Sequence, residues 1–119
     1  MPETPTFRGG RNIAMKVPAH QFDATVEAYR QMGIPILERS VSTVSFEFGP
    51  MRLHVDRVTS LSQAEIWLEF IATDALAGAN RLERAGFVRC DDVEVLPADF
   101  AGFWVTSPSS IVHLVTEIE

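Results

Sequence analysis

The chain has 119 residues, of which 46% are hydrophobic and 22% are charged, and sixteen acidic against ten basic side chains give a net charge of −6. That length suits one domain with a core of its own, and the composition is typical of a globular protein. The acidic balance argues against nucleic-acid binding, which needs clustered Lys and Arg. No apolar run reaches the roughly 18 residues that a membrane span needs. The single cysteine, Cys90, favours the reducing cytoplasm. We therefore expect a cytoplasmic protein without a nucleic-acid or membrane partner.

The first half of the chain reads as one strand, one helix and three strands. Residues 1–10, MPETPTFRGG, are predicted to be a flexible leader. NIAMKVP at residues 12–18 alternates apolar and polar side chains, as a half-buried strand does. Apolar residues at helical spacing follow, namely Phe22, Val26, Tyr29 and Met32, with Gly33 as the helix cap. ILERS, TVSFEF and MRLHVDRV then predict three strands, and the last two form a hairpin around residues 49–50.

The second half repeats this order. EIWLEFIA at residues 65–72 predicts a strand, and Asp74 suits the N-cap of a helix. That helix is expected to turn Leu76, Ala79, Leu82 and Ala85 inward and to end at Gly86. FVRCDDVEVL, AGFWVTS and SIVHLVTE then predict three strands, with a turn at SPSS. Glu65 follows Asn12 by 53 residues, and Gly86 follows Gly33 by the same 53. The sequence thus predicts a single domain over residues 11–119, in which a βαβββ repeat occurs at about 11–58 and again at about 64–118.

These repeats predict an α+β fold. A four-stranded unit with one helix covers only one face of its sheet. Two such units are expected to pair into a cup-shaped, half-open mixed β-sheet with the helices on its convex side. Because successive side chains of a strand point to opposite faces, the alternation assigns a polar set to the concave side: Asn12, Lys16, Arg52, His54, Asp56, Glu65, Trp67, Glu69 and His113. Such a set is either a solvated sheet face or a site, and the two histidines on the last strand of each half favour a site.

Three stretches carry a family resemblance: NIAMKVP, EIWLEF and SPSSIVHLV, in that order along the chain. Together with the doubled βαβββ plan, they resemble the vicinal oxygen chelate superfamily, which includes glyoxalases, extradiol dioxygenases and bleomycin-resistance proteins. The resemblance covers residues 11–117. It implies that the protein binds a small molecule in the cup.

The resemblance also implies a metal site. In metal-using members four ligands come from the first and fourth strands of each half, and these positions fall on Asn12, His54, Glu65 and His113. The last assignment assumes that the SPSS turn is one residue shorter. His54, Glu65 and His113 form a two-histidine, one-carboxylate set that suits one divalent Fe, Mn, Zn or Ni ion. Asn12 departs from the usual His or Gln and is expected to hydrogen-bond substrate or water instead.

Two classes of function stay open on these residues. One is a metal-dependent lyase, isomerase or dioxygenase, in which the metal acts as a Lewis acid and Glu69 is the candidate general base. The other is a metal-free protein that sequesters a drug-like molecule, as bleomycin-resistance proteins do. In either case the candidate ligand contacts, besides Asn12, are Lys16, Arg52, Asp56, Trp67 and Trp104. A third possibility is that the protein is a dimeric remnant of such a family that has no catalytic activity. Exposed strand edges and the family pattern both predict a homodimer.

Overall fold

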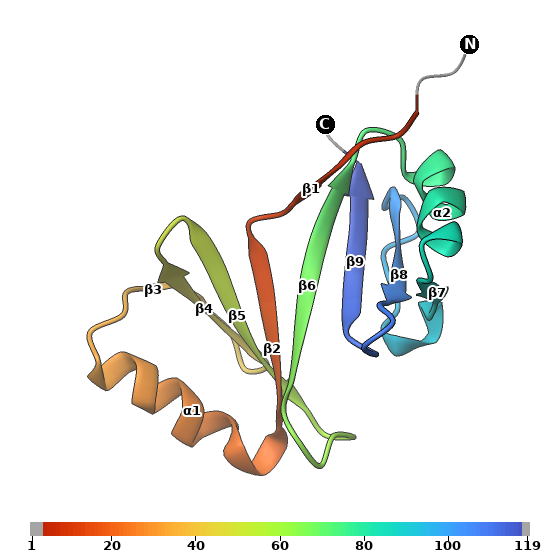
Figure 1. The fold of residues 1–119 in the computed structure, drawn as a ribbon. Helices are drawn as coiled ribbons and strands as arrows, with labels where there is room; N and C mark the ends of the chain where they lie inside the picture. The colour runs from red at the N-terminus through yellow and green to blue at the C-terminus, as the bar shows by residue number, and fades with distance from the viewer. Residues whose placement is uncertain (1–3, 118–119) are drawn as a thin grey trace. The chain divides into compact units, whose positions relative to one another are not determined.

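The computed structural model describes residues 4–117, which form two compact units, residues 11–67 and residues 4–10 with 68–117. The first unit contains β2 (Asn12–Pro18), α1 (Ala19–Gln31), β3 (Ile36–Arg39), β4 (Thr43–Phe48), β5 (Met51–Val58) and the beginning of β6 (Glu65–Ala72). Its strands are ordered β3-β4-β5-β2-β6. The pair β2–β5 is parallel and the other pairs are antiparallel (Figure 1).

The second unit repeats this arrangement. It contains β1 (Phe7–Gly9), the end of β6, α2 (Ala75–Arg84), β7 (Val88–Arg89), a 3-10 turn η1 (Asp91–Val93), β8 (Gly102–Thr106) and β9 (Val112–Glu117). Its strands are ordered β1-β6-β9-β8-β7, and β6 runs parallel to β9 as β2 does to β5. The α+β class and the doubled strand-helix-strand plan predicted from the sequence are confirmed, and the mixed sheet is open.

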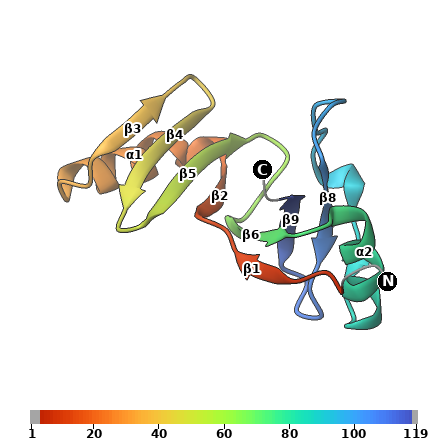
Figure 2. The same ribbon diagram turned by 90° about the horizontal axis from the view of Figure 1, so that it is seen from above.

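Each helix covers one face of its own unit's sheet (Figure 2). Helix α1 buries Phe22 and Val26 against the apolar side chains of the first unit, which are Val17, Val44, Phe46, Leu53 and Val55. Helix α2 buries Leu82 against Phe103, Val105 and Val115. Both helices are followed by a glycine at positive φ, +82° at Gly33 and +102° at Gly86. The predicted caps are therefore correct, as is Asp74, whose side chain accepts a hydrogen bond from the amide of Ala77.

Three residues predicted to face inward from the helices are exposed, namely Met32, Leu76 and Ala85, and Ala85 lies just beyond the end of α2 at Arg84. Helix α1 ends at Gln31, so Met32 lies beyond it and is 75% exposed. In α2 the buried stripe runs through Ala75, Gly78 and Leu82. Leu76 lies outside that stripe and is 84% exposed. At the beginning of α2 the buried residue is Ala75, one position before the predicted Leu76.

Two segments differ from the sequence expectation. Residues 7–9, expected to lie in a leader, form β1, which pairs with β6 with Phe7 opposite Ala72. FVRCDDVEVL, expected to be a full strand, contributes only the two residues of β7 before η1. The carboxylate of Asp91 accepts hydrogen bonds from the Arg89 side chain and from the backbone amide of Trp104, and these bonds accompany the turn that ends β7. Within residues 4–117 no helix is long and apolar enough to cross a membrane.

Candidate functional site

The sheet face of the first unit that points away from α1 carries three rows of mostly polar side chains across β4, β5, β2 and β6. The pairing registers place the members of each row opposite one another. The first row is Thr43, Asp56, Lys16 and Glu65; the second is Ser45, His54, Ala14 and Trp67; the third is Glu47, Arg52 and Asn12. We call this surface the polar face. Its residues alternate with core residues such as Val44 and Val55, so the strand period alone brings the rows together.

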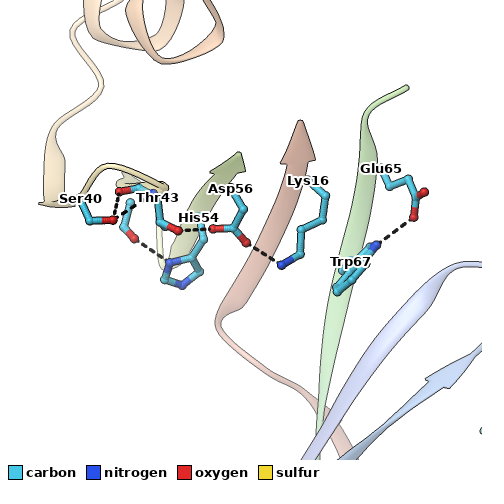
Figure 3. A network of polar contacts seen from close by, with 8 residues as sticks. Lys16, Ser40, Thr43, His54, Asp56, Glu65 and Trp67 are labelled. Atoms are coloured by element: carbon cyan, nitrogen blue, oxygen red, sulfur yellow. Dashed lines mark hydrogen bonds and ion pairs between the residues drawn. The ribbon is translucent and has the colours of Figure 1, made fainter. Parts of the chain in front are cut away.

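A buried ion pair lies in the first row. Lys16 is only 5% exposed, and its Nζ donates to Asp56 Oδ2 at 2.8 Å (Figure 3). Thr43 Oγ1 donates to the other carboxylate oxygen at 2.7 Å. The ammonium also lies 4.3 Å from the centroid of the Trp67 ring. A charge removed from water needs such partners, because desolvation alone would cost several kcal/mol. The Trp67 indole donates in turn to Glu65 Oε1 at 3.0 Å.

The second and third rows are joined through His54. Its Nδ1 lies 2.7 Å from Ser45 Oγ, and its Nε2 lies 2.7 Å from Asn12 Oδ1. An amide oxygen can only accept, so Nε2 carries the proton in this arrangement and the Ser45 hydroxyl donates to Nδ1. Ser45 is 3% exposed. Both ring nitrogens of His54 are therefore engaged within the polar face.

The polar face carries more negative than positive charge. Its carboxylates are Glu47, Asp56 and Glu65, and its cations are Lys16 and Arg52. Because Lys16 and Asp56 neutralise each other, one cation, Arg52, and two carboxylates, Glu47 and Glu65, remain on the face. The surface is thus polar and weakly acidic, with the Trp67 ring as its large apolar group.

Seven of the residues predicted for the site share this face, and three lie in the second unit. Those on the polar face are Asn12, Lys16, Arg52, His54, Asp56, Glu65 and Trp67. In the second unit, Glu69 lies in β6, where a side chain at Gly10 would collide with its carboxylate. Trp104 lies in β8, and its indole donates to the backbone oxygen of Glu94 at 3.0 Å. The Trp104 hydrogen bond is thus formed within the second unit.

His113 lies on the helix-covered face of the second unit, although we expected it on the opposite side. It is 7% exposed and stacks on Phe70 with the ring centroids 4.7 Å apart. The ring of Phe87 meets it edge-on at 5.7 Å. Its Nδ1 donates to the backbone oxygen of Ile111 at 2.9 Å. His113 thus packs in an aromatic environment beside the core of α2.

The strand registers explain this difference. In the first unit His54 pairs with Ala14. The counterpart of Ala14, 53 residues later, is Trp67. In β9, however, His113 pairs with Leu68, one residue further along β6. A shift of one residue moves a side chain to the other face of a sheet.

The metal-ligand set implied by the resemblance does not fit a divalent ion in this arrangement. A ligand must direct an open lone pair at a point that it shares with the other ligands. The Nδ1 lone pair of His54 accepts from Ser45, and His113 packs among aromatic rings on a helix-covered face. Over the described part of the chain, no three His, Cys, Asp or Glu side chains come together in a way that could hold a metal.

Two residues of the network were not predicted. Thr43 and Ser45 on β4 contribute the hydroxyl groups that bind Asp56 and His54. Their signal in the sequence is the alternation of TVSFEF, in which Val44 and Phe46 are the buried partners. Hydroxyl side chains at alternate positions of a strand are common, so this signal has low specificity.

Comparison with known proteins identifies the fold. No protein-family model matches the chain, and no curated protein matches its sequence. A Mn(II)-bound glyoxalase from Novosphingobium aromaticivorans is similar in structure, with a TM-score of 0.60 and 19% identity over 90% of this chain. This chain spans 38% of that glyoxalase. A hypothetical protein from Bacillus halodurans matches with a TM-score of 0.61 and 9% identity over 98% of this chain and 96% of that one.

A third similar structure is an NAD-dependent benzaldehyde dehydrogenase from Legionella pneumophila, with a TM-score of 0.54 and 11% identity over 90% of this chain and 99% of that one. Identities this low show a shared fold and nothing finer. The likeness to the glyoxalase, together with the doubled βαβββ plan, shows that the chain has the vicinal oxygen chelate fold that the sequence resemblance implied.

Proposed function

We propose that the protein binds a small molecule on the polar face of residues 11–67, without a metal. The observation that carries this proposal is the Lys16–Asp56 ion pair, buried at 2.8 Å beneath the Trp67 ring. A solvated sheet face would leave its lysine in water, because an exposed ammonium needs no partner and incurs no desolvation cost. The burial of this pair therefore supports the view that the polar groups of this face are ordered before a ligand binds.

Fixed polar groups are what a small-molecule site needs. Such sites combine apolar walls with a few convergent donors and acceptors, and prior ordering of those groups reduces the entropy lost on binding. On the polar face the network through Thr43 and Ser45 orders Asp56 and His54. Arg52 and Glu65 are exposed at its surface, where a ligand can reach them. The excess of carboxylates favours a ligand that carries positive charge.

Calorimetric titration with metal-free bleomycin tests this proposal, since the resembling resistance proteins sequester that drug. We expect saturable binding in the presence of a chelator, weakened at least tenfold in Glu65→Gln. Glu83→Gln removes an equal charge from an exposed position on α2 and is the matched control, with unchanged affinity. Binding that appears only after a divalent metal is added would contradict the proposal. So would the absence of saturable binding, or equal affinities of the two variants.

A metal-dependent lyase, isomerase or dioxygenase is the second candidate. One observation favours it. Asn12 Oδ1 lies 2.7 Å from His54 Nε2 on the polar face, and these residues occupy two of the four ligand positions implied by the resemblance. In that reading Glu69 remains the general base, and a ligand other than His113 has to complete the site. Elemental analysis of protein purified without a histidine tag tests it, beside a His54→Ala variant. Near-stoichiometric metal that is lost in the variant would support the second candidate over the first.

We also propose that the protein is a homodimer. In the described chain β3 and β7 are the ends of the strand order, and each pairs on one side only. Unpaired strand edges associate unless they are covered. Sedimentation velocity at micromolar concentration is expected to give the mass of two chains, and a single-chain mass would contradict this.

A further inference from the structure

A groove of about 440 Å³ lies on the helix side of the first unit's sheet, away from the polar face. It opens between α1 and the segment that joins β3 to β4. Its apolar lining consists of Phe22, Val26 and Val44, which are buried in the core of this unit, and of Val41, which is 86% exposed. Its charged lining consists of Asp23, Glu27, Arg39 and Arg57. This volume is within the range of small-molecule sites, which is roughly 300–1,000 Å³.

The two arginines of the groove have unused hydrogen-bond donors. The guanidinium of Arg57 lies over the Phe22 ring, 5.3 Å from its centroid. That contact uses the flat face of the guanidinium and leaves the N–H groups in its plane available for a carboxylate. Among residues 4–117, neither the Arg57 nor the Arg39 side chain forms a hydrogen bond or an ion pair.

One of the two carboxylates of the groove is already paired. Arg30 donates to Glu27 through Nε at 2.8 Å, and this hydrogen bond, with a second one from Gln31, lowers the pKa of Glu27 to about 2. The lining holds two guanidiniums and two carboxylates, and Arg30, which lies outside the lining, neutralises Glu27. Arg39 and Arg57 then stand against one remaining carboxylate, Asp23, in a chain whose net charge is −6. The groove is therefore a positively charged region on an acidic protein.

We propose that this groove binds an organic carboxylate with an apolar body. The carboxylate accepts from Arg57 and Arg39 in the bidentate manner that guanidinium groups favour. The apolar body lies against Val41 and against the edges of Phe22 and Val26 that line the groove. This site is separate from the polar face, because its residues lie on the α1 side of the sheet. Its ligand is an anion, whereas the polar face favours a cation.

An NMR titration with 4-phenylbutanoate tests the inference in the full chain. We expect saturable shifts of backbone amides in α1 and in residues 39–44. The neutral amide of the same body, 4-phenylbutanamide, is expected to bind at least tenfold more weakly. Arg39→Gln/Arg57→Gln is expected to weaken the binding of the acid at least tenfold. Arg84→Gln on α2 removes a charge at an exposed position outside the groove and is expected to leave the affinity unchanged.

Three outcomes would overturn the inference. They are the absence of saturable shifts, equal binding of the acid and the amide, and undiminished binding by the double variant. Thermal melting of the double variant shows whether it is folded. If the double variant is unfolded, Arg57→Lys replaces it as the test, because lysine keeps the charge but lacks the planar guanidinium. The inference then requires that Arg57→Lys binds the acid more weakly than the natural chain does. Failure here leaves the polar-face proposal untouched, because bleomycin binding is measured on the other side of the sheet.

Discussion

His54 accepts a hydrogen bond from Ser45 at 2.7 Å through Nδ1, while its other ring nitrogen donates to Asn12. The imidazole is thus held at both nitrogens by side chains of neighbouring strands, and its tautomer is fixed. A histidine held in this way has a fixed ring orientation. It has no open lone pair for a metal unless Ser45 or Asn12 moves away.

The buried ion pair of the polar face should stabilise the fold. Replacing Lys16 by Met leaves the Asp56 carboxylate half-buried without its counter-charge, and breaking a buried pair costs about 3 kcal/mol of unfolding free energy. Urea unfolding of Lys16→Met, Asp56→Asn and the double variant measures the coupling, which we expect to exceed about 1 kcal/mol. The exposed pair Arg89–Asp91 is the control, and Arg89→Met should cost less than about 1 kcal/mol. Equal costs of Lys16→Met and Arg89→Met would contradict this reading.

Strand β1 should depend on the absence of a side chain at Gly78. A Cβ at that position would lie 3.0 Å from Phe7 Cζ, and Phe7 also packs edge-on against Phe70 with the centroids 6.0 Å apart. Ala is favoured over Gly within a helix by about 0.5–1 kcal/mol, so Gly78→Ala should help α2 where Phe7 does not oppose it. We expect Gly78→Ala to be more favourable in a Phe7→Ala background than in the natural chain, by at least about 1 kcal/mol of unfolding free energy. Additive effects of the two substitutions would show that this contact does not hold β1.

Cys90 should react slowly in the folded protein. Burial raises the pKa of its thiol, and the neighbouring Asp91 carboxylate raises it further. A raised pKa reduces the thiolate fraction at neutral pH, and the thiolate is the species that is alkylated. We expect iodoacetamide at pH 7.5 to label Cys90 several-fold more slowly in the native protein than in guanidinium chloride, with a higher native rate in Asp91→Asn. A native rate equal to the unfolded rate would contradict the burial argument.

The sequence predicts the polar face well because its strands alternate cleanly. In NIAMKVP and in MRLHV every second residue is apolar, so the burial of Val17 and Val55 determines where Lys16 and Asp56 point. SIVHLVTE has apolar residues on both faces, and its parity does not determine the direction of His113. Only the register with β6 does, and register depends on the length of the preceding turn.

The contribution of the N-terminal segment was not predictable for a different reason. FRG at residues 7–9 is too short to show a strand period, and its place is determined by tertiary contacts of Phe7 with Gly78 and Phe70. In the same way, β7 ends early because Asp91 binds the backbone of Trp104, which is distant in sequence. The local sequence pattern does not reveal contacts between residues that are distant along the chain.

The most direct test of the account is the state of the His54 ring in solution. Two-bond ¹H–¹⁵N NMR spectra, assigned with a His54→Gln variant, show which ring nitrogen carries the proton. We predict the tautomer that carries its proton at Nε2, with His54 signals that stay sharp when one equivalent of Mn(II) is added. Specific broadening of the His54 signals by that single equivalent would show a lone pair open to metal, and would contradict a metal-free polar face.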